Sequence, residues 1–381
     1  MNEKVDRIQA ILDKHNVDGW IVFCHHSHDI HQKYLHEKWI SSATLTLIPK
    51  TGRPSVITSR MEEMLVDEKT YDIKAYKQGN EFTELVGKLF KDISDNSIIA
   101  LNFVEEKEVF AKLNYDILTS GAFKALTGQN KNLNYISAKE IIYDIRAVKT
   151  KKEIENHKIS AKLAEELMEN VVEPLIKPGM MEKELAALIE FECNKRGGVA
   201  FEPIVASGPN AAIPHHKAGT GKIKENQVLL IDYGVAYDMS NSDITHTYWI
   251  GSNPSEEVLR AYEAVHEAKE AAYTIIKAGI PSDIVEQAVR DKFEEFGYDH
   301  EKLYIHSTGH PIGIETHDIG VGISKSYPER PAQNLLENSV ITVEPGLYFA
   351  GEFGVRLEDD CIVIKEGVIR LSNTPKDIVC L

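Results

Sequence analysis

Apolar and polar positions in the first third of the chain follow two periods. Apolar residues recur at helical spacing over 4–14, 81–93 and 109–126. Short apolar runs typical of strands cover 19–23, 43–58 and 97–103, the second of them interrupted by a Pro49–Gly52 turn. The alternation predicts a small α/β unit, and the polar stretch 128–137 predicts a linker after it.

From residue 151 onward the helical segments become longer. Helical spacing covers 151–176, 182–196, 256–278 and 281–296, and strand patterns cover 227–237, 244–250, 339–344 and 359–364. A chain of 381 residues exceeds the size at which one core usually keeps growing. We therefore expect two domains, 1–137 and 138–381.

Charge and hydropathy exclude several classes of partner. The chain has 59 acidic and 43 basic residues and a formal net charge of -16, which disfavours binding to a phosphate backbone. No apolar run approaches the roughly twenty residues that a membrane span needs, and the charged start of the chain is unlike a secretory signal. We expect a cytoplasmic protein without a nucleic-acid or membrane partner.

The four cysteines, at 24, 193, 361 and 380, are too scattered for a zinc knuckle or a redox motif. This distribution also agrees with a reducing compartment. A metal site would then be built from carboxylate and imidazole ligands, which suit manganese, cobalt, zinc or iron.

Two carboxylates stand at the ends of apolar strand patterns. Asp232 closes the run from Val228, and Asp243 begins the next run after a polar turn. A hairpin would bring these carboxylates together, where they repel each other unless a cation lies between them. Taken alone, an Asp before a turn is more often a turn former or a helix cap.

Further polar groups follow strand patterns downstream. They are His306 and His310 in a glycine-containing segment, His317 seven residues after His310, Glu344 before Pro345–Gly346, and Glu358 two residues after Arg356. Each motif alone occurs by chance in many folds. Their joint order along the chain is the informative feature.

In that order the chain resembles the pita-bread metallopeptidases, the family of Xaa-Pro dipeptidase (prolidase), aminopeptidase P, methionine aminopeptidase and creatinase. Segment 142–149 together with Glu153 is similar to the domain junction of this family. The resemblance implies an α/β creatinase-like N-terminal domain and an α+β pita-bread catalytic domain, and it is greatest to Xaa-Pro dipeptidase-like proteins.

The same resemblance implies a dinuclear metal centre. Asp232 would bind one divalent ion, and His310 and Glu344 the other. Asp243 and Glu358 would bridge the two ions, with manganese expected first and cobalt, zinc or iron as alternatives. A hydroxide bridging the metals would be the nucleophile, and Glu344 would also serve as the acid/base.

The substrate assignment rests on four more residues that match the proline-specific branch. By resemblance, His215 and His317 contact the peptide and its tetrahedral intermediate, whereas His306 and Arg356 hold the proline end or its carboxylate. The implied activity is hydrolysis of Xaa-Pro bonds in small peptides by an Xaa-Pro dipeptidase or an aminopeptidase P-like enzyme, in a homodimer.

The sequence also departs from the family. Pro311 stands where many relatives have glycine, His246 stands where they often have arginine, and segment 24–36 is rich in histidine. These departures leave open a non-peptidase hydrolase or lyase on the same scaffold. A third possibility, an inactive binding module, is disfavoured because all five predicted metal ligands are retained.

Overall fold

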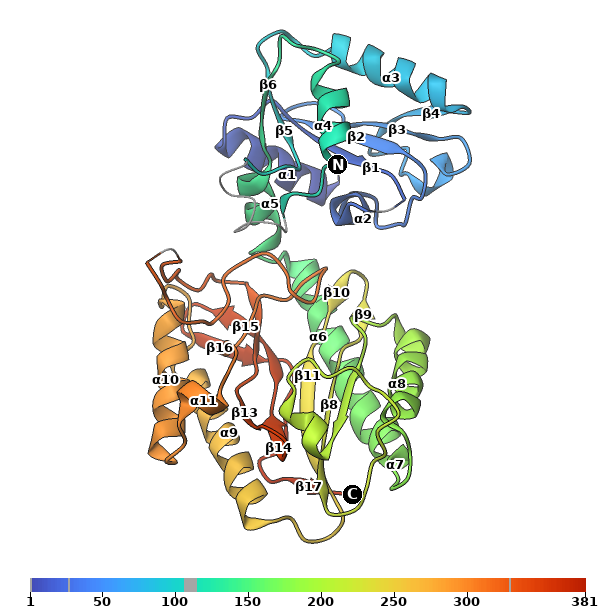
Figure 1. Ribbon diagram of the computed structural model, residues 1–381. Coiled ribbons are helices and arrows are strands. Elements are labelled where there is room, and N and C mark those ends of the chain that lie inside the picture. The colour runs from blue at the N-terminus through green and yellow to red at the C-terminus, as the bar shows by residue number, and fades with distance from the viewer. Residues whose placement is uncertain (1, 27, 106–114, 329) are drawn as a thin grey trace. The chain divides into compact units, whose positions relative to one another are not determined.

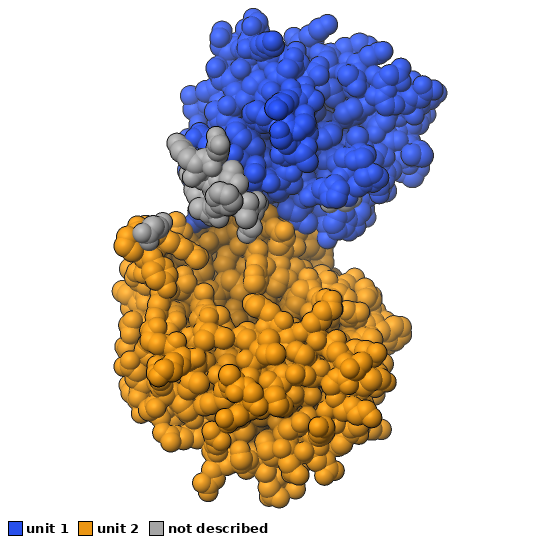
Figure 2. All heavy atoms as spheres, in the orientation of Figure 1, with its two compact units in different colours: residues 1–145 blue, residues 146–381 orange. Residues whose placement is uncertain are grey.

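The computed structural model describes residues 2–26, 28–105, 115–328 and 330–381. The chain forms two compact units, Met1–Ile145 and Arg146–Leu381 (Figure 2). The division between the two units follows residue 145, whereas the sequence pattern predicts a domain boundary after residue 137.

The first unit is built on a six-stranded sheet of order β4-β3-β2-β1-β5-β6 (Figure 1). Its strands are β1 (Gly19–Cys24), β2 (Thr44–Pro49), β3 (Ser55–Ser59), β4 (Asp72–Tyr76), β5 (Ile98–Leu101) and β6 (Asn134–Ser137). Its helices are α1 (Glu3–Lys14), α2 (Ile30–His36), α3 (Gly79–Lys91), α4 (Ser120–Thr127) and α5 (Lys139–Arg146). Alternate side chains of the sheet, such as Ile21 and Leu45, pack with Phe90 of α3 in one core.

Two predictions in this unit need correction. The predicted linker 128–137 contains β6, which pairs parallel with β5 because Leu133 and Tyr135 reach the core. A four-residue strand is too short to show a clear period in the sequence. Residues 109–114 of the predicted helix 109–126 lie outside the described residues. Helix α4 begins only at Ser120, because Thr119 caps it: the Thr119 side chain accepts a hydrogen bond from the Ala122 amide at 3.2 Å.

The second unit combines six α-helices, in the residues described, with several small sheets. The helices are α6 (Lys151–Leu167), α7 (Glu173–Leu175), α8 (Glu182–Arg196), α9 (Glu256–Ile275), α10 (Ser282–Glu295) and α11 (His300–Leu303). The predicted helix 151–176 is not continuous, because a π-helical segment, Met168–Val172, separates α6 from α7. In Figure 1, α6 to α8 flank β8 and β11, whereas α9 and α10 flank β15 and β16.

Strands β17-β11-β8-β7 form the largest sheet of this unit, β12-β15-β16 form a second sheet, and β13-β14 and β9-β10 form two hairpins. Their bounds are β7 (Ile204–Ser207), β8 (Gln227–Tyr233), β9 (Ala236–Tyr237), β10 (Ser240–Asn241), β11 (Ile244–Ile250), β12 (Val340–Val343), β13 (Gly346–Phe349), β14 (Phe353–Arg356), β15 (Asp359–Ile364), β16 (Gly367–Arg370) and β17 (Val379–Cys380). The strand predicted over 227–237 thus ends at Tyr233. Among the described helices, none combines the length and the apolar composition that crossing a bilayer requires.

Strand β8 separates two hydrophobic cores. Leu229 and Ile231 pack into the core formed with α6 and α8, whereas Val228 and Leu230 face the core that contains α9. Because strand side chains alternate, Asp232 lies on the same face as Leu230. This face of β8 therefore carries a carboxylate at the end of an apolar stripe.

Pairing between strands completes that face. β8 and β11 are antiparallel, with Thr245 opposite Asp232, so Asp243 falls on the same face, diagonally across the pair. An isolated bridge between Thr245 and Glu358 then joins β11 to the segment that leads into β15. Three carboxylates from distant parts of the sequence are thereby directed to one region.

Candidate metal centre

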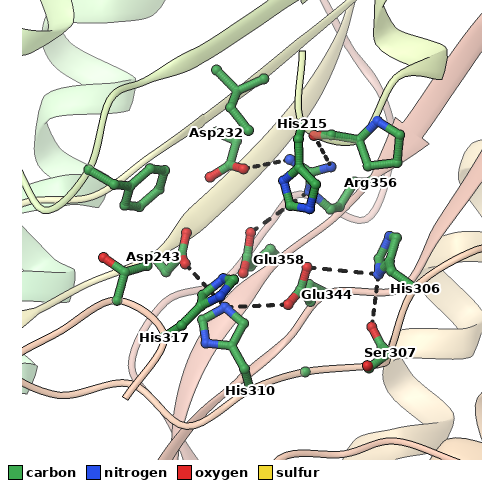
Figure 3. Close-up of a pocket in the computed structure, with 15 residues that line it drawn as sticks. His215, Asp232, Asp243, His306, Ser307, His310, His317, Glu344, Arg356 and Glu358 are labelled. Carbon is green, nitrogen blue, oxygen red and sulfur yellow. Dashed lines mark hydrogen bonds and ion pairs between the residues drawn. The ribbon is translucent and has the colours of Figure 1, made fainter. Parts of the chain in front are cut away.

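A cavity of about 490 Å³ in the second unit contains all the side chains that the sequence predicted for the site (Figure 3). These are His215, Asp232, Asp243, His306, His310, His317, Glu344, Arg356 and Glu358. Phe201, Ile204 and Pro214 give the cavity an apolar wall. Most of the lining side chains are polar or titratable, and such converging groups in a cavity are typical of a functional site.

His310 presents a nitrogen to two carboxylates. Its Nδ1 lies 3.1 Å from the Pro311 carbonyl oxygen, to which it donates, and its Nε2 lies 3.5 Å from Asp243 Oδ2 and from Glu344 Oε1. Burial lowers the pKa of His310 to about 3, so the imidazole is neutral. A neutral ring with its Nδ1 proton fixed has its Nε2 lone pair free for a metal ion.

The carboxylates are crowded in a buried place. Burial raises the pKa of Glu344 to about 8. Burial, and then the neighbouring Glu358 and Asp232, raise the pKa of Asp243 well above its usual value. Burial, and then the neighbouring Glu344, also raise the pKa of Glu358 well above its usual value. Such a cluster resists ionisation unless a positive charge compensates it.

The donor set fits divalent cations. In the described ranges, one group of three His, Cys, Asp or Glu side chains has ligand atoms that all lie within 4.8 Å of one another. It consists of Asp243, His310 and Glu358. Asp232 Oδ1 and Asp243 Oδ1 are buried and have no hydrogen-bond partner in the described structure. Buried acceptors without donors are costly, and a cation beside them would remove that cost.

Neighbouring groups orient these side chains. Thr245 Oγ1 donates to Glu358 Oε2 at 2.5 Å, and the Asp243 amide donates to Asp360 Oδ2 at 2.9 Å. Gly309 allows the backbone before His310 to approach β12 closely, since a Cβ there would lie 2.0 Å from the Thr342 carbonyl oxygen. Such supporting contacts fix the geometry of ligands before an ion binds.

Arg356 is buried and its donors are engaged within the protein. Nη2 donates to Asp232 Oδ2 at 2.5 Å, Nη1 to the Tyr348 hydroxyl at 2.9 Å, and Nε to Thr245 Oγ1 at 3.1 Å. Tyr348 also lies 2.7 Å from His306 Nε2. Because His306 Nδ1 donates to the Ser307 carbonyl at 2.8 Å, the tyrosine hydroxyl donates to Nε2. Tyr348 is not among the residues that the sequence predicted for the site, although it joins Arg356 to His306.

His215 and His317 enter the cavity from separate loops (Figure 3). Beside His215, the Pro214 carbonyl accepts a hydrogen bond from Arg356 Nη1 at 3.4 Å. The His317 ring packs on His310, with centroids 4.1 Å apart, and burial lowers the pKa of His317. Three histidines and the predicted ligands therefore surround one space.

Among the residues of the second unit that depart from the family pattern, Pro311 adjoins the site, because its carbonyl oxygen fixes the His310 ring. His246 is buried on β11, where its Nδ1 lies 3.1 Å from the Tyr248 hydroxyl, and it does not line the cavity. In the histidine-rich segment, His25, His26 and His28 are exposed, whereas His31 is buried against Asp29 at 2.8 Å.

Comparison with known proteins decides the family. The model of metallopeptidase family M24 matches residues 155–365, more than half of the chain. The chain belongs to metallopeptidase family M24. The sequence is 30% identical over 381 residues to the Xaa-Pro dipeptidase of Pyrococcus horikoshii, covering 100% of this chain and 99% of the relative.

Two solved structures extend the similarity over both units. The X-Pro aminopeptidase from Thermotoga maritima MSB8 superposes with a TM-score of 0.85 at 30% identity, covering 98% of this chain and 100% of that chain. The Xaa-Pro dipeptidase from Bacillus anthracis gives a TM-score of 0.82 at 29% identity, covering 100% and 99%. The predicted fold, a creatinase-like α/β domain followed by a pita-bread domain, is confirmed. As an M24 metallopeptidase, the protein uses divalent metal.

Proposed function

We propose that this M24 metallopeptidase hydrolyses the bond between a residue and a following proline in small peptides, using two divalent ions. The supporting observation is that the five predicted ligands line one cavity together with His215, His306 and His317. The relative and the two solved structures described above are named as peptidases of Xaa-Pro substrates.

The metal roles rest on the family resemblance, and the shared cavity of the five side chains supports them. We assign Asp232 to one ion, and His310 and Glu344 to the other, with Asp243 and Glu358 shared by both. Four carboxylates then balance the charge of two divalent ions. When bound, such ions lower the pKa of a water molecule to near neutrality and polarise the carbonyl group under attack.

Glu344 moves the proton. Its carboxyl group lines the cavity, with Oε1 3.5 Å from His310 Nε2. We propose that Glu344 accepts the proton of the attacking water and delivers it to the proline nitrogen as that nitrogen leaves. His306 Nδ1 lies 4.0 Å from Glu344 Oε2, on the side of the cavity to which we assign the proline.

The remaining polar groups bind and orient the peptide. We assign His215 and His317 to the peptide and to the negative charge that develops on its carbonyl oxygen. Arg356 donates to Asp232 and to Tyr348, so it acts on the proline end through the Tyr348–His306 contact. Phe201 and Ile204 offer an apolar surface for the substrate.

Three further assignments belong to this proposal. Manganese is the expected ion, with cobalt, zinc or iron as alternatives, since the ligands are oxygens and an imidazole. A reducing cytoplasm agrees with the four cysteines, none of which is in a disulfide. The homodimer rests on family resemblance alone.

A peptide screen tests the proposal. Protein loaded with manganese or cobalt is incubated with Ala-Pro, Leu-Pro and a longer Xaa-Pro peptide, with the Xaa-Ala analogues as controls. Cleavage before proline is expected, and the peptide length that is cleaved separates a dipeptidase from an aminopeptidase. If none of the Xaa-Pro peptides is cleaved, the proposed function is wrong.

Glu344→Gln tests the proton transfer separately. The amide can still offer an oxygen to a metal but cannot carry the proton, so turnover should fall by about 100-fold or more. Turnover near that of the wild type, in a variant shown to contain metal, would contradict the assignment.

A further inference from the structure

His317 depends on its backbone for its position. Within the described ranges, the ring has no hydrogen-bond partner, and it packs on the His310 ring with centroids 4.1 Å apart. His306 and His310, by contrast, are each fixed by a hydrogen bond from Nδ1 to a backbone carbonyl. The contacts that restrain the loop 313–318 therefore determine the position of the His317 imidazole.

Asp318, the next residue, is anchored in a buried ionic contact. Arg146 Nε donates to its Oδ1 at 2.6 Å, and Lys149 Nζ lies 3.3 Å from its Oδ2. The Ile319 amide also donates to Oδ1 at 2.7 Å. The side chains of Arg146, Lys149 and Asp318 are at most 4% exposed, so water competes little for these contacts.

The charges around Asp318 are balanced. Arg146 Nη2 pairs with Glu315 of the same loop, so two cations face two carboxylates. Burial opposes ionisation of Asp318, but Arg146 and then Lys149 outweigh it and lower the pKa of this carboxyl group. Asp318 therefore stays ionised, and the contact with Arg146 persists at neutral pH.

The loop also closes tightly on this anchor. A Cβ at Gly313 would lie 1.6 Å from Asp318 Oδ2, so only glycine allows the backbone to approach the Asp318 carboxylate this closely. The Asp318 amide donates to the Pro311 carbonyl at 2.8 Å, and the Gly313 carbonyl accepts from the Asn241 amide at 2.8 Å. The segment that carries His317 is thus restrained at both ends.

We propose that Arg146 and Lys149 are positioning residues, which clamp Asp318 and thereby hold the imidazole of His317 toward the bound peptide. This inference rests on the proposed function, in which His317 contacts the substrate. Displacing a substrate-facing group by about 1 Å can lower the rate on the order of 100-fold. Releasing the clamp therefore acts on catalysis although Arg146 touches no substrate.

Arg146→Gln tests the clamp, because glutamine keeps a donor but removes the charge and the forked geometry. Arg370→Gln is the control for the loss of an arginine–carboxylate pair, because Arg370 pairs with Glu270 at 2.6 Å in a half-buried place and neither residue lines the cavity. We expect kcat/KM for an Xaa-Pro peptide to fall on the order of tenfold in Arg146→Gln, with unchanged metal content. Arg146→Lys should recover part of the loss, and Arg370→Gln should stay near wild type.

A double-mutant cycle separates positioning from general destabilisation. On a His317→Ala background, Arg146→Gln should lower kcat/KM by less than about twofold, because the group that the clamp positions is gone. If the two losses multiply instead, the clamp does not act through His317. Absence of Xaa-Pro cleavage by the wild type would refute the proposed function before any variant is compared.

Amide hydrogen exchange tests the clamp without a substrate. Peptides covering 313–318 should exchange faster in Arg146→Gln than in Arg370→Gln and the wild type, whereas peptides from α9 should not change. Unchanged exchange at 313–318 would overturn the proposal whatever the peptide assay gives.

Discussion

Removing the divalent ions should make the stability of this metallopeptidase fall as the pH rises. Burial raises the pKa of Glu344 from 4.5 to about 8, and burial and neighbouring carboxylates raise those of Asp243 and Glu358. An acid whose pKa is higher in the folded than in the unfolded state stabilises the fold below its unfolded pKa. That stability is lost as the pH rises through the interval up to the folded pKa.

Buried histidines limit the useful pH range. Burial lowers the pKa of His306 and of His310 from 6.5 to about 3. These rings destabilise the folded protein as the pH falls below about 7.5, where the unfolded rings begin to take up protons, and this is the opposite trend. Above about pH 7.5 they are neutral in both states. Between pH 7.5 and 8.5 Glu344 alone then costs about 0.7 kcal/mol, because its carboxyl group in the folded protein is half ionised at pH 8.

The assay is thermal unfolding of EDTA-treated protein at several pH values between 7.5 and 8.5. A loss of about 0.7 kcal/mol from Glu344 corresponds to a melting temperature lower by roughly 1–3 °C in a unit of this size, and Asp243 and Glu358 add to this loss. Manganese-loaded protein should show a smaller trend, since the ions favour the ionised carboxylates. Glu344→Gln should show a shallower trend without metal. A melting temperature that stays constant or rises with pH, or an equal slope in Glu344→Gln, would contradict the raised pKa values of these carboxyl groups.

Two further predictions concern buried ionic contacts. Lys269→Met leaves the buried carboxylate of Asp359 without its cation. Denaturant titrations should therefore show a free energy of unfolding lower by about 3–5 kcal/mol. A loss below about 1 kcal/mol would contradict this prediction. Glu182 accepts from His216 Nε2 at 2.9 Å and fixes the loop that carries His215. Glu182→Gln should therefore raise KM severalfold at unchanged metal content, and an unchanged KM would show that His215 does not need this contact.

Much of the fold could be predicted from periodicity alone. The helix 182–196 and the strands 244–250 and 359–364 have the bounds that the sequence pattern predicted. Strand β6 was missed because its four residues carry too little pattern. The π-helical segment within 151–176 was missed because apolar spacing continues through it, and only the backbone hydrogen bonds change.

The site was predictable where its residues carry chemistry themselves. The carboxylates and histidines at strand ends could be recognised through their order and family resemblance. Supporting residues could not, because their partners lie far away in sequence. Thr245 is 113 residues from Glu358, and Arg146 is 172 residues from Asp318. Only the pairing of β8 with β11 and the closing of the loop 313–318 reveals what these side chains do.

A metal titration of activity decides the claim that two divalent ions in this cavity drive hydrolysis before proline. Protein stripped with EDTA is titrated with manganese while cleavage of an Xaa-Pro peptide is followed. Activity should be absent at first, rise with added metal and reach its plateau near two equivalents per chain. Cleavage that persists without metal, or no cleavage at any metal content, would contradict the claim.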